Sequence, residues 1–247
     1  MRSTFRGLGI FVCSALLAGV SYGQSHGDSG SFGIGVKGSL LGGGVEAAAR
    51  VTHRTNIRGG FNMFSYSRTF TKDNVPYDGQ LSFKTVEAHY DIFPFAGAFH
   101  VSPGVLIYAA TPITATATVP SNQSFSLGGT TYISAAGAPV NGNGNIKFNQ
   151  AAPMATVGWG NLVPRKRSKH FSIPVELGVA FQGSPKATLN LAGSVCDPGP
   201  TGPVNCRTIA SDPTVQANIL SEQNKLNNSM RFFKAYPIIS VGFGYKF

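Results

Sequence analysis

Residues 231–247 read RFFKAYPIISVGFGYKF, and this stretch decides the fold class. Counting back in steps of two, one set of positions is apolar or aromatic: Phe247, Tyr245, Phe243, Val241, Ile239, Pro237 and Ala235. The alternate set is smaller or more polar: Lys246, Gly244, Gly242, Ser240, Ile238, Tyr236 and Lys234. Alternation of period two predicts a strand whose faces meet different surroundings, and small inner residues suit a narrow lumen. A soluble edge strand could show the same pattern, so other segments must support the interpretation.

Seven further segments alternate in the same way: 32–40, 45–52, 56–69, 80–93, 99–109, 150–160 and 171–182. With the C-terminus in the periplasm, the connections at 52–55, 93–99 and 161–170 lie on the periplasmic side. Those at 41–44, 70–79, 119–147 and 193–230 then lie outside, and two of them are long. Short inner turns with long outer loops are typical of transmembrane barrels. We therefore predict an all-β fold, an eight-stranded antiparallel transmembrane β-barrel with long extracellular loops.

The outer connections carry three finer predictions. Leu81 and Phe83 are apolar, although they occupy the alternate positions at which Glu87, His89 and Asp91 face inward. A bulge near Lys84, or emergence of the strand from the membrane, would explain this break in the alternation. The Gly-, Asn- and Ser-rich residues 119–147 read as a long loop with a small hairpin at 130–134. A single helix is expected at 214–229, in the last loop, capped by Asp212 and lying over the barrel mouth; entering the lumen as a plug is the alternative.

The strand charges obey the same parity. Most acids and bases of the proposed strands fall on the inward face, and we expect them to form a lumenal ion network of Lys37, Glu46, Arg50, Arg58, Glu87, His89, Asp91, Glu176 and Lys246. A charge that faces lipid costs several kcal/mol at mid-bilayer, so a spanning barrel requires this arrangement. A soluble sandwich would bury the apolar face instead and leave these charges in water.

The N-terminus and the composition bear on location. Residues 1–23 read as a secretory signal peptide, 24–31 as a flexible tail and 32–247 as the outer-membrane barrel domain. Removing Arg2 and Arg6 with the signal lowers the formal charge from +10 to +8. The mature chain stays basic, which suits anionic lipid headgroups better than nucleic acid, because no compact basic stripe is present. In an oxidising periplasm Cys196 and Cys206 are expected to form a disulfide, and a metal pair without a nearby histidine is the rival reading.

Four stretches resemble a known family: YDIFPF at 90–95, APMATVGWGN at 152–161, ELGVAFQGSPK at 176–186 and YPIISVGFGYKF at 236–247. Together they look like small outer-membrane β-barrel proteins related to the transmembrane domain of outer-membrane protein A. The resemblance covers most of residues 80–247 and implies a fold and a bacterial outer-membrane location. It also implies that the barrel assembly machinery reads the C-terminal strand through Gly242, Phe243, Tyr245 and Phe247.

We find no residues that predict catalysis, a cofactor or a metal. His89 lies beside Glu87 and Asp91, with His100 near across a turn, but these side chains face inward and no lipid-facing Ser–His pair accompanies them. The expected function is a structural or surface-interaction role as a monomer in outer-membrane lipid. A narrow, porin-like channel for small solutes is the first alternative, because many inward positions are glycine. A lipid-modifying enzyme is the second. An interfacial aromatic girdle is expected from Tyr90, Phe93, Phe95, Phe99 and Trp159.

Overall fold

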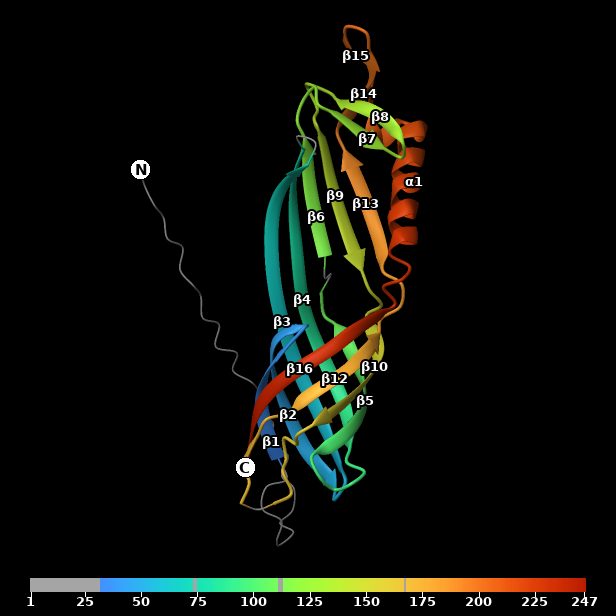
Figure 1. Ribbon diagram of the computed structural model, residues 1–247. Helices are drawn as coiled ribbons and strands as arrows, with labels where there is room; N and C mark the ends of the chain where they lie inside the picture. Colours follow the sequence, from blue (N-terminus) through green and yellow to red (C-terminus); the bar gives the residue numbers. More distant parts are fainter. Residues whose placement is uncertain (1–31, 73–74, 111–112, 167) are drawn as a thin grey trace, which may run out of the picture.

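The computed structural model describes residues 32–72, 75–110, 113–166 and 168–247. The predicted signal peptide and tail lie outside the described residues. Eight antiparallel strands form a closed barrel, which confirms the predicted fold class (Figure 1). These strands are β1 (Phe32–Ser39), β2 (Gly42–Thr52), β3 (Thr55–Lys72), β4 (Val75–Ile92), β5 (Phe99–Tyr108), β10 (Ala151–Trp159), β12 (Val175–Phe181) and β16 (Ala235–Lys246).

The C-terminal strand β16 closes the barrel. It pairs on one side with β1, from Gly33 opposite Lys246 to Ser39 opposite Ser240. On the other side it pairs with β12 and with the short strand β11 (Phe171–Ser172). The start of β1 and the end of β16 therefore meet at one end of the barrel, with the connections around 53–54, 93–98 and 160–170; we call this the turn end. The opposite end, which carries the long connections, is the loop end.

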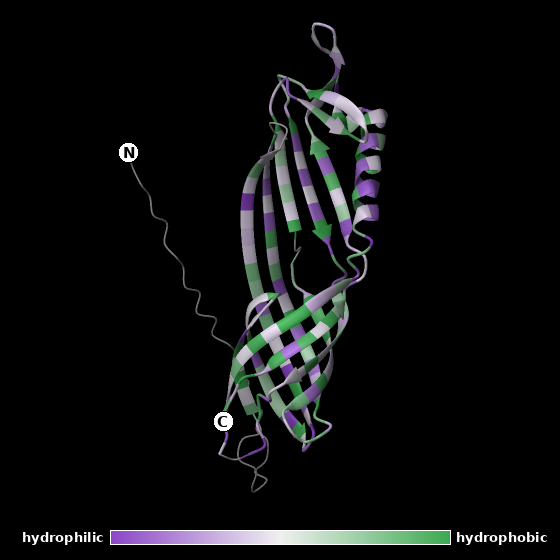
Figure 2. Ribbon diagram, in the orientation of Figure 1, coloured by the Kyte–Doolittle hydropathy of each residue, from purple (hydrophilic) through white to green (hydrophobic). Residues whose placement is uncertain are grey.

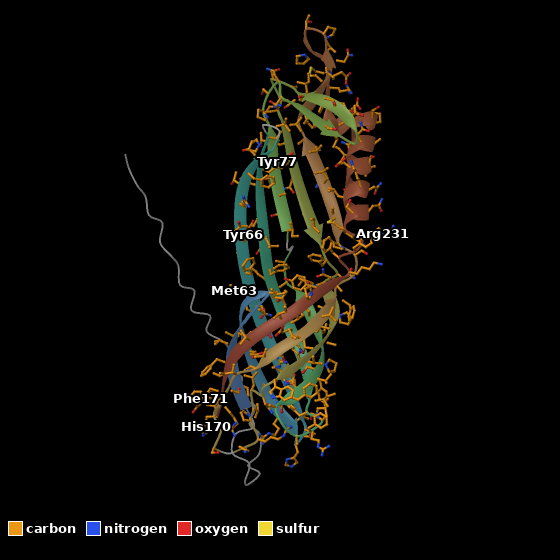
Figure 3. The ribbon with its side chains drawn as sticks, in the orientation of Figure 1. Met63, Tyr66, Tyr77, His170, Phe171 and Arg231 are labelled. Carbon is orange, nitrogen blue, oxygen red and sulfur yellow. A yellow bond between two sulfur atoms is a disulfide. The ribbon has the colours of Figure 1, made fainter. Side chains whose placement is uncertain are left out.

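Beyond the loop end, the two longest strands continue as a second sheet that we call the extension. Strands β3 and β4 have 18 residues each, whereas a bilayer is spanned by about 9–11 residues. Their far halves are joined by β6 (Ile113–Val119), β9 (Val140–Lys147) and β13 (Lys186–Ala192) (Figure 1). Figure 3 marks this region with Tyr66 and Tyr77, which lie beyond Met63 at the barrel rim.

Two predicted loops are therefore wrong. The connection expected at 70–79 is mostly strand, because β3 and β4 stay paired from Thr55 opposite Ile92 to Lys72 opposite Val75. The expected loop at 119–147 contains β7 (Ser124–Leu127), β8 (Thr130–Ser134) and β9. The hairpin expected at 130–134 is larger than predicted, because residues 130–134 form only its second strand and β7 forms the first. Glycine and asparagine are rare in strands, but here β9 gains partners on both sides, β6 and β13, that no local pattern announces.

The parity slip at Leu81 and Phe83 marks a change of environment. The β3–β4 register is continuous, so the bulge that we considered near Lys84 is absent from this pair. Odd-numbered side chains of β4 face inward along the whole strand: they are polar at Thr85, Glu87, His89 and Asp91, but apolar at Val75, Tyr77, Leu81 and Phe83. The outward side chains change in the opposite sense, from apolar at Val86, Ala88, Tyr90 and Ile92 to polar at Asp78, Gln80, Ser82 and Lys84. The barrel is thus polar inside and apolar outside, and the extension is the reverse, as in a water-soluble protein (Figure 2).

The outer face of the extension is polar in register. Strand β6 presents Thr114, Thr116 and Thr118, which pair with Asn145, Asn143 and Asn141 of β9. The Thr118 hydroxyl donates to the Asn141 side-chain oxygen at 2.8 Å. Threonine and asparagine side chains suit contact with water, so this face of the sheet is built for solvent rather than lipid.

The remaining elements cap the extension. A small sheet of β7, β8, β14 (Ser194–Gly199) and β15 (Gly202–Thr208) lies at the far end, and a disulfide joins Cys196 of β14 to Cys206 of β15. The short 3-10 helix η1 (Ile209–Ser211) then leads to the helix α1 (Pro213–Ser229), where the Asp212 carboxylate accepts from the Val215 amide at 2.8 Å.

The helix is confirmed, but its expected position is wrong. Rather than lying across the barrel mouth or entering the lumen, α1 stands upright against β13 (Figure 1). It covers an open sheet edge: the side-chain oxygens of Gln223 and Asn227 accept from the amides of Leu189 and Ala187 at 3.1 Å and 2.7 Å. An unpaired edge amide needs such a partner. Within the described residues, no helix is long and apolar enough to cross a membrane.

Candidate functional site

The middle of the barrel lumen holds an ion cluster centred on Arg58. Its guanidinium donates to Asp91 at 3.0 and 3.1 Å, to Glu46 at 3.0 Å and to Glu176 at 3.1 Å, so one cation from β3 joins three other strands. Arg58 is 3% exposed, and the three carboxylates are 3–4% exposed. A planar guanidinium with five donors suits this multidentate role. Because Arg58 bonds to all three carboxylates, the cluster ties the barrel wall together across its interior.

Lys37 and two histidines extend the cluster. The Lys37 ammonium lies 3.7 Å from Glu46 and also forms a close ion pair with Glu87. His100 Nε2 lies 3.0 Å from Glu176, and His89 Nε2 lies 3.6 Å from Glu87. The Ser102 hydroxyl donates to Asp91 at 2.6 Å. His100 and Ser102 were not among the predicted network residues, although His100 was expected nearby; their inward parity on β5 is the sequence signal that indicates them.

The structure separates Arg50 and Lys246 from this cluster. Both lie towards the turn end, where the Arg50 guanidinium donates to the Pro164 carbonyl at 3.3 Å. The Lys246 ammonium donates to the carbonyls of Pro164 and Lys166 at 3.0 and 3.2 Å. Of the nine predicted network residues, these two therefore hold the connection between β10 and β11 rather than the mid-lumen carboxylates. The reason is axial position, which parity alone does not specify.

One part of the cluster has the outline of a metal site. Asp91, His100 and Glu176 each offer a ligand atom, and these atoms lie within 4.8 Å of one another. However, the Arg58 guanidinium already contacts both carboxylates, at 3.0 Å from Asp91 and through a second close pair with Glu176. A cation is thus already supplied by the chain itself, and these residues fit an ion network better than a metal centre.

The turn end of the lumen is filled by the chain itself. The connection after β10 folds inward and buries Leu162 and Val163, at 4% and 0% exposure, against Ala48. Three inward glycines make room for Leu162. A Cβ at Gly33 would lie 2.2 Å from the Leu162 carbonyl oxygen, and one at Gly35 or Gly244 would lie 2.8 or 2.3 Å from its side chain. The alternating pattern predicts the inward glycines, but it does not indicate that residues 162–163 occupy the space they leave.

Other inward glycines accommodate members of the ion cluster. A Cβ at Gly60 would approach the Glu87 carboxylate to 2.8 Å, and one at Gly158 would approach His100 to 2.7 Å. The glycines therefore do not leave an open path along the lumen at these positions. Each gives its space to a larger side chain on a neighbouring strand, which is the packing that an eight-stranded barrel requires.

The loop end of the lumen is closed by an apolar layer. This layer consists of Leu41, Phe83, Leu106, Tyr108, Ala152, Met154, Ala180 and Ile238, with Leu81, Phe148 and Tyr236 packed against it. Phe83 and Tyr236 have ring centroids 5.8 Å apart, and Tyr108 donates from its hydroxyl to the Gln182 side chain at 2.5 Å. From the loop end to the turn end, the lumen thus has three filled levels: the apolar layer, the ion cluster, and the inward-folded residues 162–163, which we call the Leu162 segment.

The outer surface carries aromatic residues at the turn end. Trp159 is 65% and Phe95 is 81% exposed, and Phe99 lies between them with centroid distances of 5.4 and 6.1 Å. Phe93 was expected in this girdle, but it is only 1% exposed, with its ring under the Arg165 guanidinium at 4.7 Å. The chain turns there, so Phe93 points inward.

The predicted assembly residues lie on the closing strand. Phe243, Tyr245 and Phe247 face outward at 50%, 38% and 58% exposure, whereas Gly242 faces inward beside Pro174. His170 and Phe171 lie next to them at the turn end (Figure 3), where the Phe171 ring is 5.2 Å from Tyr245. Phe247 also donates its amide to the Phe32 carbonyl at 3.1 Å, which holds the two ends of the barrel domain together.

Comparison with known proteins gives structural neighbours only. No protein-family model and no curated protein sequence matches the chain. Among solved structures, Acinetobacter baumannii CarO aligns over 87% of this chain and 97% of its own, with 20% identity and a TM-score of 0.47. Acinetobacter baumannii CarO2 aligns over 87% of this chain and 98% of its own, with 20% identity and a TM-score of 0.49. The barrel architecture follows from the strand pairing above and does not depend on these neighbours.

Proposed function

We propose that this chain is a monomeric outer-membrane β-barrel protein of Gram-negative-type bacteria, with a structural or surface-interaction role and no catalytic activity. In this proposal the barrel is a closed anchor, and the extension with its cap is the part that meets the surroundings of the cell. The filled lumen is the observation that carries the proposal.

The distribution of polarity supports membrane insertion. The barrel exposes large apolar side chains on its outside, such as Val36 at 58%, Leu177 at 55% and Ile239 at 50%. A water-soluble protein would not expose such a continuous apolar belt, whereas lipid requires one. Along β4 the inward side chains change from polar at Thr85 to apolar at Phe83. This reversal supports the loop end as the boundary at which the strands leave the hydrocarbon.

The turn that precedes β16 supports the same boundary. Phe232 and Phe233 are 91% and 63% exposed, and the exposed Arg231 and Lys234 flank them. Backbone contacts fix this turn, because Gln182 donates its side-chain amide to the Phe233 carbonyl at 3.2 Å. Aromatic side chains beside basic ones suit the level of the lipid headgroups. Arg231 projects to the side at this level in Figure 3.

Export and assembly complete the proposal. The secretory signal at 1–23, the resemblance to barrels related to outer-membrane protein A and the terminal aromatic strand all favour recognition by the barrel assembly machinery. The lumenal histidines and carboxylates are buried away from the lipid face, which favours a non-catalytic role over a lipid-modifying enzyme. Incubation with lipopolysaccharide or phospholipid is expected to yield no product.

Membrane location and lumen closure are tested separately. Membrane fractionation and heat-modifiable gel migration are expected to identify a folded barrel in the outer membrane; a soluble periplasmic protein would overturn the architecture. Planar bilayers that contain the purified protein are expected to show no steady openings, with a general porin as the positive control. Reproducible wild-type openings would favour the alternative, a narrow channel for small solutes. Leu162→Ala would then raise the conductance if the Leu162 segment limits the path.

A further inference from the structure

The extension encloses a cavity that the closed-barrel role does not use. Its volume is about 540 Å³, and it lies between the inner face of the extension sheet on one side and β7 and α1 on the other. Its walls include Tyr77 on β4, Ala117 on β6, Leu189 and Leu191 on β13, and Phe125 on β7. Ligand sites are typically concave, mostly apolar and roughly 300–1,000 Å³ in volume. The cavity has the size and lining of a small-molecule site.

One glycine, Gly144, keeps the floor of the cavity open. Gly142 and Gly144 occupy inward positions on β9, between the buried Val140 and the half-buried Ile146. A Cβ at Gly142 would lie 2.9 Å from the Leu191 side chain, which takes that space. A Cβ at Gly144 would meet no atom closer than 3.9 Å, so the space next to it is not taken by a neighbouring side chain. This differs from the lumen, where each glycine discussed above yields to a larger neighbour. Glycine weakens a strand, and it often marks the close approach of a ligand.

One carboxylate stands in this mostly apolar wall, whose other polar side chains are neutral: Thr116, Ser124, Ser126, Asn145 and Thr188. Glu222 lines the cavity together with Leu226 and Met230 of the following turns. It lies one helical turn after the buried Ile219, on the face of α1 that packs inward. In the part of the chain that the structure describes, no hydrogen bond or ion pair is formed by Glu222, and the cavity lining contains no lysine or arginine. The helix is held in place by Gln223 and Asn227 on the β13 edge, so Glu222 is kept at the cavity wall.

We propose that this cavity binds a small amphiphile with an apolar body and a single positive charge. The apolar walls would take the body, and the Glu222 carboxylate would pair with the cationic group at the partly exposed rim. The inference deepens the proposed surface-interaction function and rests on it, because the extension must lie outside the membrane for the cavity to meet such a molecule. An anionic amphiphile of the same length is excluded by charge repulsion.

The test compares two probes that differ in head-group charge. Protein in lipid nanodiscs, labelled at leucine and valine methyl groups, is titrated with hexyltrimethylammonium or with hexanesulfonate, and methyl chemical shifts are recorded. The cation is expected to shift the methyl signals of Leu189, Leu191 and Leu226 saturably, whereas the anion is not. Glu222→Gln should reduce the affinity for the cation about fivefold, as expected for the loss of one partly exposed ion pair.

Two variants of adjacent residues test the location of the site. Gly144→Leu fills the cavity floor and should abolish the saturable shifts, while Asn143→Leu places the same side chain on the solvent face and should leave them unchanged. If Gly144→Leu fails to fold, the affinities of Glu222→Gln and of the unchanged protein for the two probes still test the site. Equal binding of both probes, binding that survives Gly144→Leu, or no saturable binding at all would overturn the inference. Bilayer conductance would overturn only the closed-barrel role, so the two proposals fail by different results.

Discussion

Arg58 offers the most demanding test of the filled lumen, because this one side chain donates hydrogen bonds to three buried carboxylates. Arg58→Met keeps the length of the side chain and removes its charge and donors. Asp91, Glu46 and Glu176 then lose hydrogen bonds of 3.0–3.1 Å at positions that are 3–4% exposed. Removing one partner of a buried ion pair costs about 3–5 kcal/mol. We expect the free energy of unfolding to fall by an amount in this range.

Trp159 is a suitable reporter for the measurement. It is the only tryptophan in the chain, and it lies on the outer face of the barrel at 65% exposure. Urea unfolding in lipid vesicles moves this residue from lipid to water, so its fluorescence follows the folded fraction. Arg68→Met is the matched control: it lies on the same strand as Arg58, but its side chain is exposed in the extension. A surface change of this kind should alter stability by less than about 0.5 kcal/mol.

A double variant separates charge from packing. Adding Asp91→Asn to Arg58→Met removes one of the uncompensated carboxylates, so the pair should be less damaging than the sum of the single changes. A coupling of about 0.5–3 kcal/mol is expected for residues in direct contact. The reasoning would be refuted if Arg58→Met cost no more than Arg68→Met, or if the two effects at the cluster were additive.

Three further predictions concern the cap and the closing strand. Reduction of the bond between Cys196 and Cys206 should speed proteolysis of the cap hairpin and leave the urea midpoint of the barrel unchanged, because the hairpin lies at the far end of the extension; a shifted midpoint would contradict this. Phe247→Ala should reduce the amount of protein assembled in the outer membrane, measured by heat-modifiable migration, with little effect on the stability of protein that has folded, since the ring is 58% exposed; normal assembly would argue against a targeting role. The pKa of Asp197 is held below its ordinary value by the hydrogen bond from Arg207, so the pair stabilises the hairpin above that ordinary value and loses its effect as the pH falls through the lowered pKa; NMR titration of the Asp197 carboxyl should show the shift, and Arg207→Gln should remove it.

The barrel strands were predictable because lipid imposes a strict local pattern. Every residue of a spanning strand faces either hydrocarbon or a narrow interior, so charge and size alternate along 86–92 and 171–182 in a way that can be read without knowing the neighbours. The placement of Glu46, Glu87, Asp91 and Glu176 inside the barrel follows from the same constraint, and the structure finds all four there.

The extension was not predictable by that argument, because its environment is reversed. Leu81 and Phe83 looked like errors of parity, although they keep the inward direction and only the surroundings change from ion cluster to apolar layer. The strand at 140–147 is rich in glycine and asparagine, and it is held by β6 and by β13, whose partner residues lie as far away in sequence as Ala192, which pairs with Asn141. The glycine and asparagine content of this segment argues against a strand. Its strand conformation therefore depends on pairing with segments that are distant in sequence.

The sequence by itself determined the closed barrel, the direction of its charged face, the helix after Asp212 and the role of residues 235–246 as the last strand, since each depends on local periodicity or capping. Only the tertiary structure decided that Leu162 fills the space beside Gly33, Gly35 and Gly244, that Arg50 and Lys246 leave the central cluster, and that α1 holds Glu222 at a cavity wall. These features depend on axial position and on contacts between distant segments, and an alternating pattern carries no information about either.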